Sequence, residues 1–339
     1  MRVGMLGINH KLADLKLRES LAKICRRRFA CDFYTHINHH LVLLSTCNRT
    51  EIYFFSEDLA ETHSYILSVL RNDLSDNFDQ KLYSYFGKDC LAHLCRVTTG
   101  LDSAIVTETE IQGQVKQAYE QAQKNAALPF EIHYLFQKAL SIAKKVRAVL
   151  PSKPGLPDIE HAILETGQHI FDHSSDASIL FVGASGINEK ILSYFKHKNF
   201  SNMTICNRSR GNAETIASRY AIPILDWEQL HSWHDYDWVI LGTKAPEYLI
   251  KSRPLPVHSK HKLIIDLAVP RNADPSLSRH KNITLLNIDQ INRRLKIRRQ
   301  YLSQSIDLAE AMVSKAIHHH LMLFHEKEKN RLRLYASTA

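Results

Sequence analysis

The sequence predicts an α/β protein of several domains: a small α+β sandwich, then a domain with a parallel sheet, then a long helix. Three observations predict this. The chain has 339 residues, which is too many for a single ordinary hydrophobic core. Short apolar runs near the N-terminus alternate with amphipathic patterns in the order βαββαβ. Further along, buried-type strands alternate with helices, as in a doubly wound sheet.

Composition narrows the class of protein. Hydrophobic residues make up 44% and charged residues 23% of the chain, which is ordinary for a globular protein. Because no run of 18 apolar residues occurs, we expect no membrane span, and the free cysteines of a chain without an export signal favour the cytoplasm. The net charge of +9 permits a polyanionic partner. No cysteine or histidine spacing predicts a metal site.

The first domain reads as a split βαβ, or ferredoxin-like, sandwich because of the order of its elements. Strands are expected wherever β-branched and aromatic residues form short runs, and helices wherever apolar residues recur every three or four positions. The expected elements are a strand over 2–8, a helix capped by Asp14, strands on either side of Cys47, a helix near 59–70 and a strand near 82–85.

The turn around Cys47 is the most informative stretch of the first domain. Residues 45–50 place a thiol, an amide, a guanidinium, hydroxyls and, just after them, a carboxylate between two strands, with no glycine. A thiolate is a strong nucleophile, and the nearby Arg49 is expected to lower the pKa of Cys47. The alternative is that Cys47 is a small buried apolar side chain, and spacing alone does not decide between the two.

The stretch Ser45-Thr46-Cys47-Asn48-Arg49-Thr50-Glu51-Ile52-Tyr53 resembles the signature of the glutamyl-tRNA reductase family. The resemblance implies the NADPH-dependent reduction of tRNA-bound glutamate to glutamate-1-semialdehyde, the first step of tetrapyrrole (heme and porphyrin) biosynthesis. It also implies a ferredoxin-like catalytic domain, a thioester on Cys47 and the release of tRNA.

The segment that follows matches the same family. A helical pattern that carries His93 runs to Gly100, which suits a helix end, and Gly100-Leu101-Asp102-Ser103 matches a family element. The stretch 105–116 matches another element, with Thr107 in place of a glycine and Glu110 in place of a glutamine. Taken alone, this stretch indicates only a helix that begins with acidic residues.

The resemblance assigns site residues in the first domain. Cys47 would be the nucleophile, and His93 would assist by proton transfer or by positioning. Arg49 is the expected clamp for a substrate carboxylate, because a guanidinium binds both oxygens. The residues implied to line the glutamate pocket are Thr46, Asn48, Arg49, Ser103, Glu108, Thr109, Glu110 and Gln114.

The proline-rich stretch 151–157 predicts a linker, so the domains are expected at 1–150, 151–287 and 288–339. After it, the strand over 178–183 runs into a glycine turn and a helix, the context of a dinucleotide pyrophosphate site in a Rossmann-type domain. Ser185 and Asn188 stand where the motif usually has its second and third glycines. The cofactor residues expected in this turn are Gly183, Ala184, Ser185, Gly186, Ile187 and Asn188.

The end of the second strand of this domain indicates which nicotinamide nucleotide is used. Asn207, Arg208 and Ser209 follow that strand together with Arg210, where an NAD site would carry an acidic residue for the ribose hydroxyl. Arginine and serine suit a 2′-phosphate, so NADPH is favoured over NADH. Further parallel strands are expected at 238–243, 263–271 and 283–287.

From Asp289 to about Leu334 the chain has no proline or glycine and keeps a helical apolar pattern, which predicts one long helix of about 45 residues. The family has a spinal helix here, followed by a dimerisation domain, most of which we expect this chain to lack. Homodimer formation is therefore in doubt. A partnership with the semialdehyde aminotransferase is expected of the family because the aldehyde is reactive.

Two other functions remain open at this stage. A small-metabolite Rossmann dehydrogenase, similar to shikimate dehydrogenase, would share the second domain but not the Cys47 segment. A non-catalytic tRNA-binding relative would keep the fold, and the altered glycine turn and Glu110 favour it.

Overall fold

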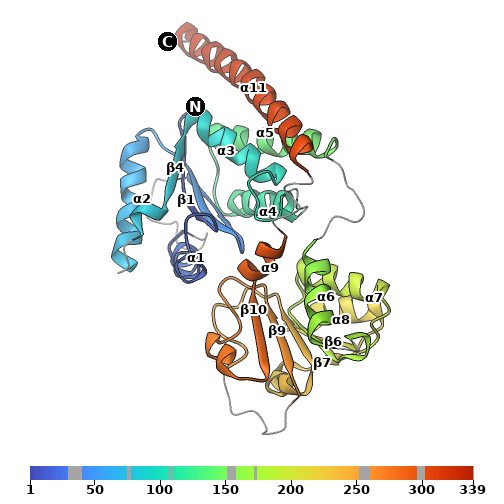
Figure 1. Ribbon diagram of the computed structural model, residues 1–339. Coiled ribbons are helices and arrows are strands. Elements are labelled where there is room, and N and C mark those ends of the chain that lie inside the picture. The colour runs from blue at the N-terminus through green and yellow to red at the C-terminus, as the bar shows by residue number, and fades with distance from the viewer. Residues whose placement is uncertain are drawn as a thin grey trace. The chain divides into compact units, whose positions relative to one another are not determined.

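The computed structural model describes residues 1–29, 40–74, 78–106, 108, 110–150, 158–171, 174–251, 260–295 and 302–338. The chain divides into two compact units (Figure 1). The first comprises Met1–Pro154 and Arg298–Ala339, and the second comprises Gly155–Ile297. The expected linker at 151–157 lies outside the described residues, and the expected functional domain limits stay predictions.

The first unit contains a four-stranded antiparallel sheet with the strand order β2-β3-β1-β4. This order, with two crossing helices, is the predicted ferredoxin-like sandwich. Its elements are β1 (Val3–Asn9), α1 (Leu15–Phe29), β2 (His40–Ser45), β3 (Arg49–Phe55), α2 (Leu59–Asp73), a 3₁₀ turn (Asp79–Lys81) and β4 (Tyr83–Phe86). The cap expected for α1 is present, since the carboxylate of Asp14 accepts from the amide of Leu17 at 2.9 Å.

Helices α1 and α2 cover one face of this sheet. Because side chains alternate along a strand, Ile52 and Phe54 of β3 point to this face, where they pack with Leu21 of α1 and Ile66 of α2. Every residue of β1 is buried, which shows that the opposite face is covered as well.

The opposite face lies under α3 (Gly87–Thr99), α4 (Glu110–Asn125) and α5 (Phe130–Arg147). The ring of Tyr53 meets Phe136 of α5 edge-on, with the ring centroids 5.4 Å apart. Helix α3 ends where predicted, because Gly100 adopts the left-handed conformation with φ = 80°. Arg49, Glu51 and Tyr53 alternate with the apolar residues of β3 and therefore lie on this second face.

The long C-terminal helix, α11 (Ser303–Thr338), packs on α3 and α5. Arg96 Nη1 donates to Glu310 at 2.5 Å, and the hydroxyl of Tyr134 donates to the carbonyl of His320 at 2.6 Å. The predicted helix was expected to run unbroken from Asp289. That expectation is wrong in its start, because a separate helix, α9 (Ile288–Arg294), comes first, and neither proline nor glycine marks its end.

The second unit contains a parallel sheet with the order β10-β9-β8-β5-β6-β7. In chain order this is 6-5-4-1-2-3, so the order reverses between β5 and β8, where doubly wound sheets bind nucleotides. The elements are α6 (Ile159–Ile170), β5 (Ile179–Val182), α7 (Gly186–His197), β6 (Met203–Cys206), α8 (Arg210–Tyr220), β7 (Ile224–Leu225), β8 (Trp238–Leu241), β9 (Lys262–Asp266), β10 (Ile283–Asn287) and α9, with 3₁₀ segments at Ser174–Asp176, Trp227–Asp235 and Pro275–Arg279.

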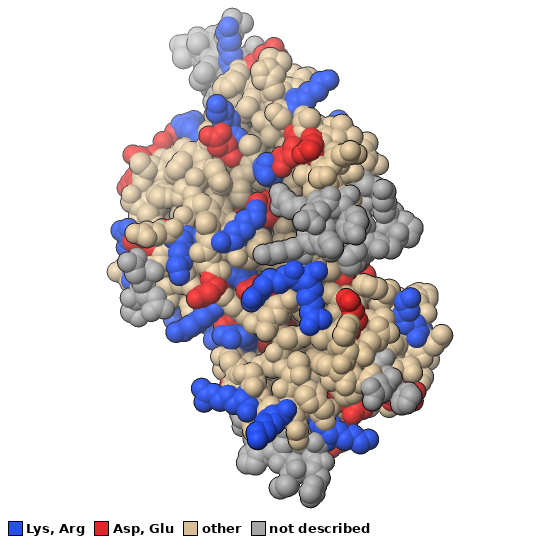
Figure 2. All heavy atoms as spheres, viewed as in Figure 1, with Lys and Arg blue, Asp and Glu red and all other residues tan. Residues whose placement is uncertain are grey.

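Within the described residues, no helix is long and apolar enough to cross a membrane, and no group of three His, Cys, Asp or Glu residues could hold a metal ion. On the face drawn in Figure 2, lysine and arginine side chains are spread among acidic ones. The positive net charge alone therefore does not define a nucleic-acid surface on this face.

The packing of α6 on the second sheet depends on Gly167. A Cβ at Gly167 would lie 1.9 Å from two atoms of the Trp238 ring, which is fully buried and stacks on Phe171. We therefore expect Gly167→Ala to lower the free energy of unfolding by about 1–3 kcal/mol or more. Thermal unfolding measures this, with Gly211→Ala as the control, because a Cβ there has no neighbour within 4 Å. Equal melting temperatures for the two variants would contradict the prediction.

Candidate active site and dinucleotide site

The Cys47 turn is shaped by a threonine hydroxyl. The Oγ1 of Thr46 accepts from the amides of Asn48 and Arg49, each at 3.2 Å, and the amide of Thr46 donates to the carbonyl of Arg49 at 2.8 Å. A side-chain turn of this kind needs no glycine, which explains the residues used here. The carbonyl of Asn48 accepts from the amide of His10 at 2.9 Å, which joins the turn to the end of β1.

Cys47 lies at the tip of this turn and is partly exposed. The Nη1 of Arg18 donates to its carbonyl at 2.6 Å. The pKa of the Cys47 thiol is raised to about 12, chiefly because the surrounding protein desolvates the sulfur; the negative charges of Glu108 and Glu110 contribute to the increase, and Arg18 opposes it. The expectation that Arg49 lowers this pKa is therefore wrong, and the cation beside the thiol is Arg18.

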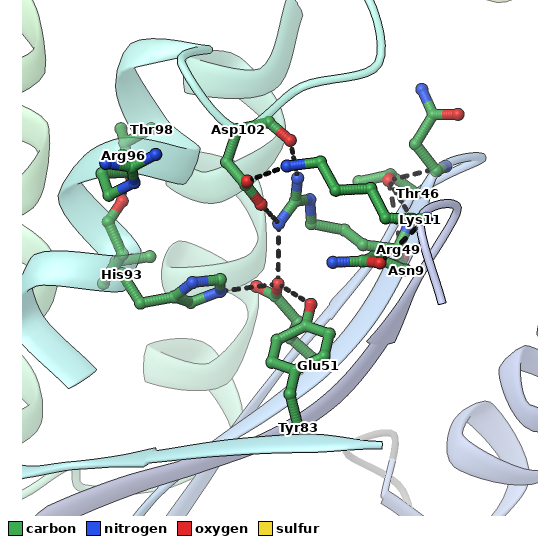
Figure 3. Close-up of polar contacts among 12 residues, drawn as sticks. Asn9, Lys11, Thr46, Arg49, Glu51, Tyr83, His93, Arg96, Thr98 and Asp102 are labelled. Atoms are coloured by element: carbon green, nitrogen blue, oxygen red, sulfur yellow. Dashed lines mark hydrogen bonds and ion pairs between the residues drawn. The ribbon is translucent and has the colours of Figure 1, made fainter. Parts of the chain in front are cut away.

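Arg49 instead points under α3, into a buried network of charges (Figure 3). Its guanidinium donates to Glu51 at 2.8 Å, to the carboxylate of Asp102 at 3.0 Å and to the carbonyl of Asp102 at 2.6 Å. Lys11 also pairs with Asp102. The network thus balances two cations with two carboxylates. Binding a substrate carboxylate with both Arg49 nitrogens would require release of these partners, and its clamp role stays a prediction.

Glu51 is the centre of this network. Its carboxylate accepts from Arg49 and from three more donors: Tyr53 at 2.6 Å, Tyr83 at 2.5 Å and the Nε2 of His93 at 2.9 Å. Burial alone would raise the pKa of Glu51, but the charge of Arg49 and the hydrogen bonds from His93 and Tyr53 bring it well below its usual range. Glu51 is therefore a carboxylate and accepts only.

His93 is held by this carboxylate from the side of α3. Because Glu51 can only accept, the Nε2–H of His93 donates to it, which defines the orientation of the ring. The ring also stacks on Tyr85, with the centroids 4.8 Å apart, and meets Tyr83 edge-on. Sequence reasoning named His93 but missed Glu51 as its partner, although the alternation of β3 already placed Arg49 and Glu51 on one face.

Of the remaining predicted pocket residues, Ser103, Glu108, Glu110 and Gln114 lie in the described part of the chain, from the loop after α3 to the first turns of α4. Ser103 is buried and Glu110 begins α4, with Gln114 one turn later on the same side of the helix. The carbonyl of Glu108 accepts from Arg147 at 2.6 Å. Thr109 lies outside the described residues.

Glu108 is the most perturbed acid near the thiol. Burial raises the pKa of its carboxyl to about 7; the neighbouring charge of Glu110 also raises it, while Ser103, Arg49 and Arg147 lower it. The charge of Glu108 is also one cause of the raised pKa of the Cys47 thiol, so the carboxyl and the predicted nucleophile interact electrostatically.

The glycine turn of the second unit has the form of a dinucleotide site. Gly183 follows β5 with φ = 102°, and a Cβ there would lie 2.6 Å from the carbonyl of Gly242, so only glycine fits. Ser185 is the N-cap of α7, and its Oγ accepts from the amide of Asn188 at 3.3 Å. The amides of Gly186 and Ile187, in the first turn of α7, have no partner within the helix and suit a phosphate.

The loop after β6 is tied to this turn. The side chain of Asn207 accepts from the amide of Ala184 at 3.0 Å and donates to the carbonyl of Ser209 at 2.8 Å. Arg210 pairs with Glu214 and with Asp226, at 3.1 and 2.6 Å. Arg208 is exposed and makes no such pair within the described part of the chain. Of the two arginines expected to favour a 2′-phosphate, Arg208 is therefore the available one.

We expect Glu51→Gln to destabilise the chain by about 3–5 kcal/mol, because it leaves buried Arg49 without one of its two counter-charges. Since the pKa of Glu51 is lower in the folded chain, its contribution is present above the unfolded pKa of about 4.3 and is lost as the pH falls below it. Urea unfolding between pH 7 and 3 measures both. Asp79→Asn, which breaks an exposed pair with Arg71, is the control and should cost under about 1 kcal/mol. Equal losses in the two variants would contradict this.

Known proteins resemble this chain over most of its length. A family model described as the N-terminal domain of glutamyl-tRNA(Glu) reductase matches residues 6–149, and a shikimate/quinate 5-dehydrogenase model matches residues 165–294. The glutamyl-tRNA reductase of Chlorobium phaeovibrioides is 31% identical over 304 residues, which cover 86% of this chain and 72% of that protein. The enzyme of Syntrophobacter fumaroxidans is 28% identical over 323 residues, covering 91% and 70%.

Among solved structures, glutamyl-tRNA reductase from Methanopyrus kandleri matches with a TM-score of 0.50 and 21% identity, covering 98% of this chain and 82% of that one. This likeness confirms the fold. The identity and coverage of the Chlorobium relative, together with the match over residues 6–149, go further than fold. The chain belongs to the glutamyl-tRNA reductase family.

Proposed function

We propose that this chain reduces tRNA-bound glutamate to glutamate-1-semialdehyde with NADPH, the first step of tetrapyrrole biosynthesis, through a thioester on Cys47. Family membership supports the overall reaction. The observation that carries the mechanism is the position of Cys47: a partly exposed thiol on a hydrogen-bonded turn, under the influence of the partly buried carboxyl group of Glu108.

The first step is attack by the Cys47 sulfur on the ester carbonyl that joins glutamate to the tRNA. The resting thiol is protonated at neutral pH because its pKa is raised to about 12. Glu108 takes this proton while the sulfur–carbon bond forms, since its own pKa of about 7 leaves much of it ionised. The carbon–oxygen bond to the tRNA then breaks, the leaving oxygen takes the proton that Glu108 accepted, and the glutamyl group stays on sulfur.

The pocket residues around the thiol suit a glutamyl group. A glutamyl ester carries an α-ammonium group, and Glu110, whose charge acts on the Cys47 thiol, supplies a complementary carboxylate. We assign the other contacts to the side chains that the family resemblance implies. They are Thr46, Asn48, Arg49, Ser103, Thr109 and Gln114.

We also assign a role in the reaction to His93. Glu51 holds its ring by the Nε2–H, and Tyr83 and Tyr85 fix its plane. We infer that His93 gives a proton to an oxygen or orients the acyl group in the reduction.

The second unit holds the nicotinamide nucleotide. A cradle in which a Cβ at Gly183 would clash, followed by the free amides of the first turn of α7, fits a pyrophosphate. When bound, the reduced nicotinamide would supply a hydride for the thioester carbon. Cleavage of the carbon–sulfur bond leaves the aldehyde and a Cys47 thiolate, which takes a proton from water. Arg208 and Ser209 favour NADPH, since no acidic residue at this loop binds a ribose hydroxyl.

The alternatives explain less of the chain. A small-metabolite dehydrogenase accounts for the match over residues 165–294 and leaves residues 6–149 unexplained.

We further infer a cytoplasmic enzyme that passes its reactive aldehyde to the aminotransferase that consumes it.

The decisive assay uses tRNA charged with labelled glutamate. With NADPH the chain should form the semialdehyde, and without NADPH it should still release tRNA, because thioester formation needs no reductant. Cys47→Ser should lose both activities by at least about 10³-fold, since a serine hydroxyl is a weaker nucleophile than a thiol and Glu108, with a pKa of about 7, is too weak a base to activate it. Cys95→Ser, a change at a buried cysteine on α3, is the control. Normal turnover by Cys47→Ser would exclude the thioester mechanism.

The proton acceptor gives a separate pH prediction. Release of tRNA without NADPH should accelerate as the pH rises through about 7, where Glu108 loses its proton. Glu108→Gln should slow this release by about 10²–10⁴-fold and abolish the rise. Glu110→Gln should keep the rise. A pH profile that is unchanged in Glu108→Gln would assign the proton to another group.

The cofactor preference is tested by two neighbouring arginines. Arg208→Ala should weaken NADPH binding by about tenfold, roughly 1.4 kcal/mol, and leave NADH binding unchanged, because only NADPH carries the 2′-phosphate. Arg210→Ala is the matched control, since that side chain already pairs with Glu214 and Asp226. Fluorescence titration measures both nucleotides. Equal weakening of NADPH and NADH by Arg208→Ala would contradict the assignment.

A further inference from the structure

The third glycine position of the dinucleotide turn is occupied by Asn188. A glycine there usually lets the helix pack closely on the first strand. Asn188 is only 1% exposed, so its side chain fills the space that this packing normally closes. The turn of this chain must therefore be stabilised in a different way.

The side-chain amide of Asn188 provides that stabilisation. Its Nδ2 donates to the carbonyl of Val182, the last residue of β5, at 2.9 Å and to the carbonyl of Gly183 at 2.8 Å. Its backbone amide donates to the Oγ of Ser185 at 3.3 Å. One residue thus joins the strand end, the left-handed glycine and the helix cap, which are the parts of the turn that approach a pyrophosphate.

The room for this side chain comes from Gly242, which follows β8. A Cβ at Gly242 would lie 2.5 Å from the Oδ1 of Asn188 and 2.9 Å from the Oγ of Ser185. Strands β5 and β8 are neighbours, and the strand order reverses between them. In this chain the position that requires a glycine is therefore 242, at the end of the adjacent strand, and not 188 in the helix.

The Oδ1 of Asn188 indicates that a ligand or water completes this site. It is buried and has no hydrogen-bond partner among the described residues. A buried acceptor without a hydrogen-bond donor is unfavourable, so a donor should meet it in the working protein. A phosphate oxygen cannot donate, but a water bound to the phosphate, or a ribose hydroxyl of the nucleotide, can.

We propose that Asn188 and Gly242 are a coupled pair that shapes the pyrophosphate site, with Asn188 as a positioning residue for the nicotinamide dinucleotide. This rests on the nicotinamide-cofactor part of the proposed function and adds residue 242, which no motif marks. Asn188 acts through the shape of the turn and the presentation of the amides of Gly186 and Ile187.

The test is a double-mutant cycle on the full chain, read by NADPH fluorescence titration without tRNA and by thermal unfolding without nucleotide. Asn188→Asp has the same size but loses both amide donors and adds a charge near the phosphates, so NADPH affinity should fall at least tenfold. Gly242→Ala should fall by a similar factor. Asn188→Gly should weaken binding less and should restore part of the loss when combined with Gly242→Ala, because it removes the clash. Gly211→Ala is the control.

The proposal is overturned if Asn188→Asp and Gly242→Ala bind NADPH as tightly as the control, if the double variant shows purely additive losses, or if the unaltered chain does not bind NADPH. Should Gly242→Ala fail to fold, recovery of a cooperative transition in the double variant supports the pair, and failure of both contradicts it. Release of tRNA without NADPH, measured on the same samples, tests the proposed function separately, because that step does not use the dinucleotide.

Discussion

The buried carboxylate of Glu51 is the group on which the first unit depends most directly. It accepts hydrogen bonds from residues of β3, β4 and α3, so one side chain ties the central strand to an edge strand and to the helix above it. Removing a carboxylate from water costs several kcal/mol, which these donors must offset together. Their positions are therefore mutually constrained, and the orientation of the His93 ring follows from that constraint.

The two candidate sites differ in whether side chains or backbone groups form them. In the first unit, side chains define the candidate site: a threonine shapes the Cys47 turn, and Arg49 belongs to a set of two cations and two carboxylates. In the second unit the backbone defines it, through a left-handed glycine and the open amides at the start of α7. The first site is thus sensitive to charge changes, and the second to changes in side-chain volume.

Local pattern predicted most of the fold because apolar spacing reports directly on strands and helices. The ferredoxin-like order, the Asp14 cap and the Gly100 helix end were all visible in short stretches. The surroundings of the site were not, because burial and pairing arise between distant segments. Arg49 meets Asp102 53 positions away, and Arg18, from α1, stands beside Cys47. The prediction that Arg49 lowers the pKa of Cys47 was based on proximity in sequence alone, and it is wrong.

The paired volumes at positions 188 and 242 also constrain how such a site can change by single substitutions. Glycines at both 242 and 188 do not clash with each other. With asparagine at 188, a Cβ at 242 would lie 2.5 Å from the Oδ1 of the asparagine. Single substitutions can therefore convert an ordinary turn into this one in one order only: glycine must appear at position 242 before asparagine appears at position 188. The reverse change requires the opposite order, so as long as Asn188 is present, position 242 cannot accept a residue larger than glycine.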